Sequence, residues 1–462
     1  MISLADLQKS LPETALFGNT QTTDSIGWAL SPTPYYLTTK QTEFLKNLGG
    51  VLFRFNNAIE SLYRQSLKDI SYAWIKEIFH AGKPASLISF SQMHRIKHDI
   101  PLVIRPDLLV TENGFTLTEL DSVPGGIGFT SALNVAYREA GFNVIEAADG
   151  MPEAFLKALQ SLSGDQPAKI AIVVSNESAD YYPEMAWLVE KLQKSYPDIH
   201  LIRPDMIRLH DDILGFHTKE GSFQPINVIY RFFELFDLPN ISQIELIQYA
   251  IKKRIVTCTP PFKPFFEEKI ALALIHHPFL ISFWVKHLST DDFSCLKNLI
   301  PESWILDPAP IPPEAAVIPS LALNDKLFQR FADLAEATQK QRELVIKPSG
   351  FSPLAWGSRG VKIGHDLPQE AWKLALEEAL NQFSHTPHLL QRFVHAAVKE
   401  YQFFNPQSGE VQTSEGRTRL TPYYFVNGET PLLAGILATT CRKDKKIIHG
   451  MKDGVMSPAA IK

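Results

Sequence analysis

Apolar and polar residues follow two different periods in the first part of the chain. Residues 1–99 carry apolar side chains three and four positions apart, as in TEFLKNLGGVLFRFNNAIESLYRQSL, which predicts a mostly helical region. From residue 100 the segments PLVIRPDLLVT and FTLTELDSV have the composition of strands and flank an Asn-Gly turn signal at 113–114. We therefore predict a β-hairpin, followed by a Pro-Gly-Gly break at 124–126 and a helix that ends at Gly141.

The rest of the chain mixes strand and helix patterns. AKIAIVVSN predicts a strand and YYPEMAWLVEKLQKSY the helix that follows it, which together form a unit of an α/β layer. NVIYRFFELFDL and KKRIVTCTPP indicate further strands, and FFEEKIALALIHHP predicts a helix up to Pro278. A proline-rich stretch at 305–320 predicts an extended connector. Beyond it, RELVIKPSGFSPLAWGSRGVKIG predicts two strands around a glycine-containing loop, PQEAWKLALEEALNQF a helix and HLLQRFV a strand. These patterns are typical of an α/β (α+β) fold.

Composition narrows the class of protein but does not identify a reaction. The 462 residues are 45% hydrophobic and 21% charged, and the net charge of −5 gives no long-range attraction to nucleic acid. We find no apolar run long enough for a membrane helix and no signal peptide at the start, so we predict a cytoplasmic protein that binds neither membrane nor nucleic acid. Its three cysteines are odd in number and far apart, which argues against disulfides and against a cysteine metal site.

The predicted hairpin at 105–121 carries the most informative polar residues. Arg105 and Asp107 are two positions apart, as are Glu119 and Asp121, so each pair points to one face of its strand. Pairing of the strands would gather three carboxylates and one arginine, and such hard oxygen ligands suit Mg²⁺ beside phosphate groups. The alternative is a solvated polar face on a half-exposed hairpin, because charges on one face of exposed strands are common.

Two lysines and one strand are weaker candidates for a nucleotide-binding site. Lys347 ends the apolar strand LVIK and precedes a glycine-containing loop whose backbone N–H groups would suit phosphates; the alternative is a surface hairpin with a salt-bridging lysine. Lys269 lies in the apolar helix pattern FFEEKIALAL, where the alternative is a lysine that extends to solvent. The backbone N–H and C=O groups of the strand LLQRFV at 389–394 would suit the edge of an adenine ring; the alternative is a plain core strand.

These pieces occur in a specific order. R-x-D and E-x-D-x-x-P-G-G come first, followed by Tyr230-Arg231, P-P-F-K, E-K-x-x-L-x-L, I-K-P-x-G, L-L-Q-R-F-V and the tail AGILATTCRKDKKIIHG. In this order the chain resembles the circularly permuted ATP-grasp ligases, the group that includes the synthetase domain of glutathionylspermidine synthase. In that group the metal-binding strands precede the lysine-bearing half. The resemblance spans residues 100–455.

The resemblance implies a division of the chain and a set of site residues. It implies an ATP-grasp fold in circularly permuted order, with a helical region at 1–99, a metal-binding hairpin and α/β substrate subdomain at 100–255, and a nucleotide-binding half with a lid loop at 256–462. It implies catalytic roles for Arg105 and Arg442. Two Mg²⁺ ions would be held, together with ATP, by Asp107, Glu119 and Asp121. The residues implied to bind ATP are Lys269, Lys347, Gly350, Gly357, Gly360, Gln391, Arg392, Phe393 and Val394.

The reaction that follows from these roles is ATP-dependent ligation of a carboxylate to an amine. A substrate carboxylate would attack the γ-phosphate to give an acyl phosphate and ADP, and an amine would then displace phosphate. The sequence departs from the family at the third metal position, where Asp121 replaces the usual Asn. Two alternatives stay open: a phosphotransferase with no amine step, and a non-catalytic ATP-binding protein. The acid and amine are expected to be small molecules or peptides, and the sequence leaves their identity and the oligomeric state open.

Overall fold

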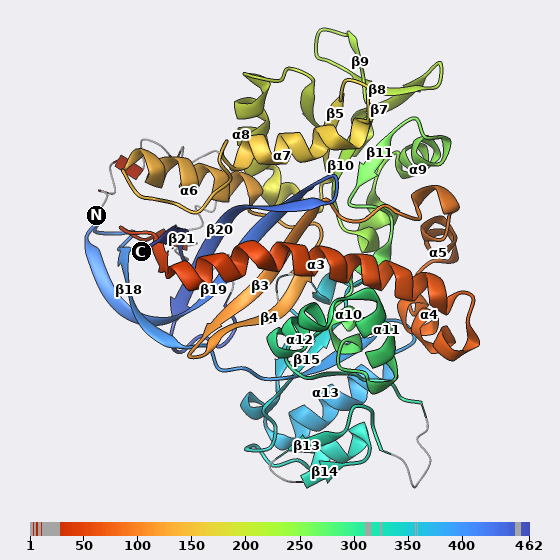
Figure 1. The fold of residues 1–462 in the computed structure, drawn as a ribbon, viewed down its shortest axis with the longest axis vertical. Helices are drawn as coiled ribbons and strands as arrows, with labels where there is room; N and C mark the ends of the chain where they lie inside the picture. The colour runs from red at the N-terminus through yellow and green to blue at the C-terminus, as the bar shows by residue number, and fades with distance from the viewer. Residues whose placement is uncertain are drawn as a thin grey trace.

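The computed structural model describes residues 3, 6–7, 11, 28–309, 316–323, 326–355, 357, 359–448 and 454–462. It is a mixed α/β protein, as the sequence predicts, with three larger sheets and their covering helices (Figure 1). Part of the predicted proline-rich connector, 310–315, lies outside the described residues. Among the described helices, none is long and apolar enough to cross a lipid bilayer.

The largest sheet has eight strands and draws on all three predicted parts of the chain. Its order is β1-β21-β20-β19-β3-β4, with β18 paired to β19 and β2 to β21. All pairs are antiparallel except those of β1 and β2, which run parallel to β21. The strands are β1 (Trp28–Leu30), β2 (Tyr35–Leu37), β3 (Val103–Thr111), β4 (Gly114–Asp121), β18 (Val398–Phe404), β19 (Val411–Asn427), β20 (Thr430–Arg442) and β21 (Gly454–Ile461). The division of the chain at residues 99 and 255 stays a prediction.

Helices cover the two faces of this sheet unequally. Helix α3 (Thr39–Ser66) crosses one face (Figure 1), where the Tyr424 hydroxyl donates to the carbonyl of Leu45 at 2.6 Å. Helices α6 (Ile127–Glu139) and α7 (Met151–Gln160) cover part of the other face, where a side chain at Gly435 would collide with both. Tyr423 points to this second face, because neighbouring residues of a strand alternate. The uncovered part of the second face forms the floor of the cavity described below.

A four-stranded parallel sheet stands beside that cavity. Its order is β11-β10-β5-β6, formed by β5 (Ile170–Val174), β6 (Ile199–Ile202), β10 (Val228–Phe232) and β11 (Thr257–Thr259). Helix α8 (Tyr182–Gln193) connects β5 to β6, and α9 (Ile244–Lys253) precedes β11. Every residue of β5 and β10 is buried, as expected of parallel strands covered on both faces. The carboxyl ends of these strands lie at one edge, which is where open α/β sheets place their ligands.

A third sheet carries the predicted nucleotide lysine. It is antiparallel, in the order β12-β17-β15-β16, and consists of β12 (Ser303–Ile305), β15 (Leu344–Pro348), β16 (Lys362–Ile363) and β17 (His388–Arg392). Helix α13 (Gln369–Asn381) covers it through the buried Trp372. Trp372 shares a hydrophobic cluster with Trp304, Leu344 and Leu390, so this sheet has a small core of its own.

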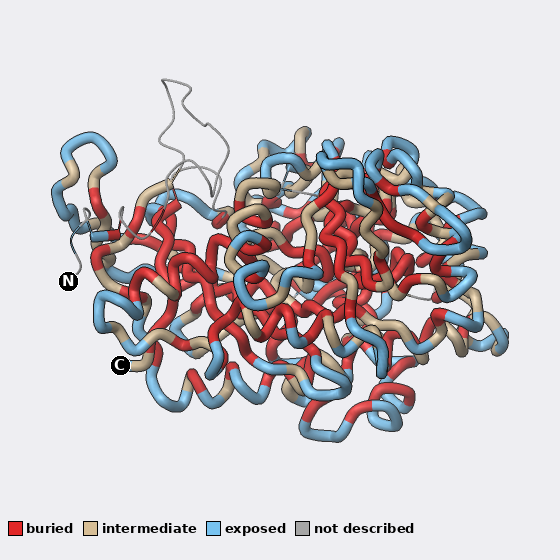
Figure 2. Tube along the Cα trace, turned by 90° about the horizontal axis from the view of Figure 1, so that it is seen from above, coloured by how far each residue is buried: buried red, intermediate tan, exposed pale blue. Residues whose placement is uncertain are grey.

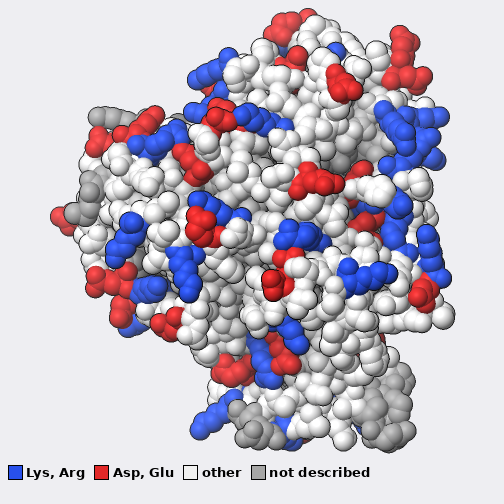
Figure 3. Space-filling view, in the orientation of Figure 1, with Lys and Arg blue, Asp and Glu red and all other residues white. Residues whose placement is uncertain are grey.

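The remaining elements surround these sheets. They are α4 (Ala73–His80), α5 (Ala85–Ser91), α10 (Ile270–Leu274), α11 (Ile281–His287), α12 (Thr290–Leu299), β7 (Ile207–His210), β8 (Ile213–His217), β9 (Phe223–Pro225), β13 (Leu321–Leu323) and β14 (Lys326–Phe328). Figure 2 shows the buried interior running through the molecule beneath exposed connections. The face in Figure 3 intersperses basic and acidic side chains, so it presents both signs of charge.

Two secondary-structure predictions need correction. Residues 28–37, in the region predicted to be mostly helical, contribute β1 and β2 to the large sheet. The helix predicted up to Pro278 is reduced to α10 and single turns, and the chain is extended at Glu268. The physical reason is a tertiary bond: the Lys269 N–H donates to the carbonyl of Ser349 at 2.6 Å, which ties this segment to the glycine loop.

Candidate active site

The hairpin of β3 and β4 brings the predicted metal and phosphate residues together. Arg105 pairs with Asp121 and Asp107 pairs with Glu119 across the two strands. Because paired residues stand on one face of a sheet, the four charged groups form a single cluster, as the sequence predicts. The register shifts directly after Asp107, and such bulges bend a strand where a side chain must be aimed.

Cations from three segments neutralise this cluster. The Arg105 guanidinium lies 2.6 Å from Asp121 and 3.4 Å from Asp107. The Lys269 Nζ lies 2.7 Å from a Glu119 oxygen. Arg419, on β19 and 312 residues from Asp107 along the chain, donates to Asp107 at 2.8 Å. Each carboxylate thus faces a cation. An incoming metal ion would compete with that cation for the carboxylate, and an incoming phosphate would compete with the carboxylate for the cation.

Burial and charge shift the pKa values in this cluster in opposite directions. Burial would raise the pKa of Glu119, but the charge and hydrogen bond of Lys269 outweigh it and hold that pKa below its usual value. Burial raises the pKa of Asp121, and Arg105 offsets only part of the shift. Burial lowers the pKa of Lys347 to about 8. Glu119 is therefore firmly ionised at neutral pH, and an anion beside Lys347 would stabilise the ammonium charge.

The Pro-Gly-Gly turn closes one side of the cluster. Gly126 has φ of +91°, and a side chain there would strike the Tyr423 hydroxyl, which donates to the carbonyl of Gly125 at 2.8 Å. A side chain at Gly125 would strike the ring of Tyr181. Glu184 of α8 accepts two backbone N–H groups at the start of α6, at 2.7 and 2.9 Å, and so acts as its cap. Only glycines allow the backbone to lie this close to the cavity.

One cavity of about 810 Å³ opens beside the cluster. Its floor is the uncovered face of the large sheet, formed by Arg419, Thr421, Tyr423, Leu437, Thr439 and Met456. Thr439 is fully buried, and its hydroxyl has no hydrogen-bond partner within the described part of the chain. The floor therefore offers one guanidinium and apolar surface to a bound molecule.

A second wall of the cavity is acidic. It is formed at the carboxyl ends of β5, β10 and β11 by Glu177, Asp180, Glu234, Asp237 and Glu267. Glu267 is paired with the buried Arg231 at 2.6 Å, whereas the other four have no ion pair among the described residues. Burial together with the charges of Glu177 and Glu267 raises the pKa of Asp237 to about 6. The wall favours a cationic group over an anionic one.

Lys347 lies next to the hairpin but does not line the cavity. Its ammonium donates to the Gln391 side-chain oxygen at 2.8 Å and to the carbonyl of Thr118 at 3.2 Å. Gln391, on β17, is buried and donates to the Ser303 hydroxyl at 3.1 Å. The predicted lysine and the predicted adenine strand are thus in contact with each other, beside the strand that bears Glu119.

The other residues predicted to line the adenine pocket are turned to other partners. Arg392 pairs with Glu302 at 2.8 Å and donates to the carbonyl of Ala322. The Phe393 N–H donates to the carbonyl of Glu343 at 3.0 Å, and Val394 follows as a half-buried residue. None of the three is among the described residues that line the cavity, so their adenine role stays a prediction.

The glycine loop contributes two of its three predicted residues to the lining of the cavity. Gly350 and Gly357 line the cavity, whereas Gly360 packs on Pro348 outside it. Lys269 reaches across the cavity to this loop and donates to the carbonyl of Ala355 at 3.1 Å. Arg442 lies elsewhere, with an exposed side chain 3.5 Å from Asp444 at the end of β20, and its catalytic role stays a prediction.

The fit of this site to Mg²⁺ depends on phosphate. Among the described residues, no group of three or more His, Cys, Asp or Glu side chains could hold a metal ion by itself. Asp107 nevertheless keeps one buried oxygen without a hydrogen-bond donor. Mg²⁺ in phosphate sites is bound through one or two carboxylates and the substrate phosphates. The donor set therefore fits Mg²⁺ that arrives with a nucleotide, and does not fit a preformed metal cage.

Sequence reasoning missed Arg419 and the acidic wall. Arg419 lies in SEGRTRLTPYYF, where nothing local distinguishes it, because its position depends on the pairing of β19 with β3. The acidic wall had a usable signal: Glu177 and Glu234 follow within three residues of buried strands that pair in parallel, where ligands are bound.

Comparison with known proteins supports the fold. No family model and no curated protein matches the chain. A solved glutathione synthetase-like effector from Globodera pallida, in its apo form, is 11% identical with a TM-score of 0.56, over 99% of this chain and 96% of that one. The two proteins share a fold.

Two further solved structures are more distant. A protein described as a γ-glutamylcysteine synthetase from Methylobacillus flagellatus KT has a TM-score of 0.41 at 10% identity, over 92% of this chain and 89% of its own. D-alanyl-alanine synthetase A from Vibrio cholerae has a TM-score of 0.27 at 10% identity, over 63% and 87%. At these scores neither structure bears on the site.

Proposed function

We propose that this protein is an ATP-dependent ligase that activates a carboxylate as an acyl phosphate, joins it to an amine and releases ADP and phosphate. The observation that carries the proposal is the single cavity at which Arg105, Asp107, Glu119, Asp121 and Lys269 meet. Phosphoryl transfer depends on positioning and charge neutralisation, which this set of side chains supplies. The fold shared with a glutathione synthetase-like effector and the motif order resembling circularly permuted ATP-grasp ligases support the same reaction class.

The phosphates of ATP would enter between the hairpin and the glycine loop. Lys269, now held by Glu119 and Ala355, would turn to the phosphates, and Arg105 would face the γ-phosphoryl group in transfer. Asp107, Glu119 and Asp121 would hold Mg²⁺ with the phosphates, where it neutralises charge on the transferring group. Gly350 and Gly357 let the loop approach, which excludes water that would hydrolyse an acyl phosphate.

The two organic substrates would occupy different walls of the cavity. The acid would lie on the sheet floor, where the Arg419 guanidinium would be its hydrogen-bond donor. The amine would approach from the acidic wall as an ammonium ion. Asp237, with a pKa of about 6, is ionised at neutral pH and suited to accept the proton that the amine must lose before it attacks.

Two other functions would use the same cavity. A phosphotransferase would release ADP with an acid alone, and a non-catalytic protein would bind ATP without hydrolysis. The acidic wall favours the ligase, because neither alternative needs a cation subsite beside the phosphoryl site. The substrate identities and the cytoplasmic localisation stay predictions.

Release of ADP with matched omissions tests the proposal. Purified protein with Mg-ATP is screened against pools of carboxylic acids and amines, and products are weighed by mass spectrometry. We expect ADP release with one acid and amine pair, and a product whose mass is the sum of the two less one water. ADP formed equally without the amine, with a phosphorylated acid as the product, would establish a phosphotransferase. ATP binding with no turnover in any pool would contradict the ligase.

A further inference from the structure

A lysine from the N-terminal region lies beneath the candidate nucleotide site. Lys83 stands in the turn between α4 and α5, its side chain is fully buried, and its ammonium pairs with Glu268 and donates to the carbonyl of Ala81 at 3.1 Å. Gly82 has φ of +72°, and a side chain there would strike the backbone carbonyl of His385. The turn thus packs closely against the half of the chain that bears Lys347.

Glu268 connects this lysine to the glycine loop. Its other oxygen accepts the Ser349 hydroxyl, and the Ser349 oxygen in turn accepts the Ile270 N–H at 3.0 Å. The Ser349 carbonyl accepts the Lys269 N–H at 2.6 Å. These bonds join the segment that carries Lys269 to the segment that begins the loop at Gly350, and both segments line the cavity.

The charge of Lys83 is what allows this arrangement. The Glu268 side chain is 1% exposed, and a carboxylate buried to that degree stays ionised only when a cation compensates it. Without Lys83, the buried Glu268 carboxylate would lack its compensating charge, which would disturb its bond to Ser349. The ammonium also lies 5.6 Å from the ring centre of Phe351, a cavity-lining residue of the loop.

We propose that Lys83 is a positioning residue for the nucleotide site. Through Glu268 and Ser349 it holds the Lys269 ammonium and the start of the glycine loop in the arrangement that receives the ATP phosphates. The inference rests on the proposed function and assigns a role there to residues 1–99, in which the sequence indicates no chemistry.

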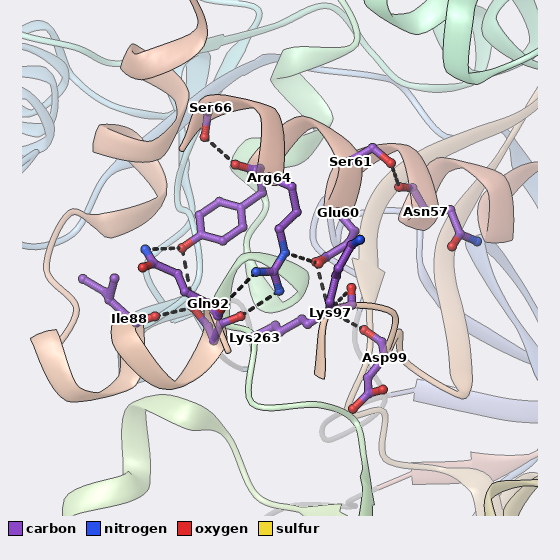
Figure 4. A network of polar contacts seen from close by, with 12 residues as sticks. Asn57, Glu60, Ser61, Arg64, Ser66, Ile88, Gln92, Lys97, Asp99 and Lys263 are labelled. Atoms are coloured by element: carbon purple, nitrogen blue, oxygen red, sulfur yellow. Dashed lines mark hydrogen bonds and ion pairs between the residues drawn. The ribbon is translucent and has the colours of Figure 1, made fainter. Parts of the chain in front are cut away.

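A second buried lysine provides a matched control. Lys263 is equally buried, pairs with Glu60 at 3.0 Å and donates to the carbonyls of Lys97 and Asp99 at 3.2 and 2.7 Å (Figure 4). Glu60 is on α3 and is also bound by Arg64 at 2.7 Å. This network likewise joins the N-terminal region to the chain just before α10, but among the described residues none of its bonds reaches Ser349 or Lys269. Loss of either lysine removes one cation from a buried carboxylate, and Glu60 then keeps its bond to Arg64.

The test compares Mg-ATP affinity with thermal stability in Lys83→Met, Lys263→Met and Ser349→Ala. We expect both lysine variants to lose thermal stability, but only Lys83→Met to bind Mg-ATP about ten-fold or more weakly, the usual scale for residues that orient a binding group. Ser349→Ala keeps the Lys83–Glu268 pair and should also weaken Mg-ATP binding. If Lys83→Met does not fold, Ser349→Ala alone tests the proposal.

The outcomes separate this inference from the proposed function. Wild-type protein that binds no Mg-ATP would overturn both. Wild-type binding with unchanged affinity in Lys83→Met and Ser349→Ala would overturn the positioning role alone. Equal weakening by Lys263→Met would also overturn it, because the effect would then follow from loss of fold stability.

Discussion

Replacing Glu119 with glutamine is expected to lower ATP turnover by about a thousand-fold or more, the upper range for loss of one charge-stabilising group. Glutamine keeps the shape of the side chain but removes the charge that faces Lys269 at 2.7 Å and that would hold Mg²⁺ with the phosphates. Glu119 is at the cavity end of β4 and is partly open to solvent, so the fold should survive the change. The measurement is ADP release at saturating Mg-ATP, with a thermal melt on the same sample.

The hairpin offers its own control for this variant. Glu112 is in the exposed turn of the same hairpin, away from the cavity, so Glu112→Gln should keep the wild-type rate. If Glu119→Gln were to keep it as well, the assignment of the hairpin carboxylates to metal and phosphate would be wrong.

Replacing Lys347 with alanine is expected to weaken Mg-ATP binding by about 10- to 100-fold, the scale of one charged hydrogen bond. The half-buried ammonium lies between Gln391 and the carbonyl of Thr118, and no described residue is in direct contact with it as a counter-ion. Lys362, exposed on the neighbouring strand β16, is the matched control, because Lys362→Ala removes the same charge at the surface. Titration calorimetry with Mg-ATP measures both variants. Equal affinity of wild type and Lys347→Ala would remove Lys347 from the nucleotide site.

The same lysine predicts a pH dependence. Burial lowers its pKa from 10.5 to about 8, so the free protein loses the ammonium charge as pH rises through that value. Mg-ATP affinity of the wild type should therefore decline above about pH 8. Lys347→Ala should not show this decline, which makes the difference between the two titrations the informative quantity.

The parts of the site that the sequence predicts are those set by local pairing. The hairpin of β3 and β4 is closed by a short turn, and its alternation alone puts Arg105, Asp107, Glu119 and Asp121 on one face. Strands β5, β10 and β11 and helix α8 of the parallel layer follow for the same reason, since their apolar periods are short and strong. In these segments local preference and tertiary packing agree.

The parts that the sequence does not predict depend on distant pairing. Arg419 reaches Asp107 only because β19 lies beside β3. The segment around Lys269 has a helical pattern. Its bond to Ser349 and the ion pair of Glu268 with Lys83 keep the first residues of that segment extended, so the helix begins later. Strands β1 and β2 are three residues each, too short for a periodic signal, and exist because β21 provides an edge.

Transfer of oxygen from the acid to phosphate tests the central claim most directly. The protein is incubated with Mg-ATP, the amine pool and carboxylic acids labelled with ¹⁸O in both carboxylate oxygens. The ¹⁸O content of the released phosphate is then measured by mass spectrometry. We expect one ¹⁸O atom in each phosphate formed with product, because attack by the carboxylate on the γ-phosphorus leaves its oxygen in the phosphate when the amine displaces it. ADP and amide product with unlabelled phosphate would contradict an acyl phosphate, and with it the role assigned to this cavity.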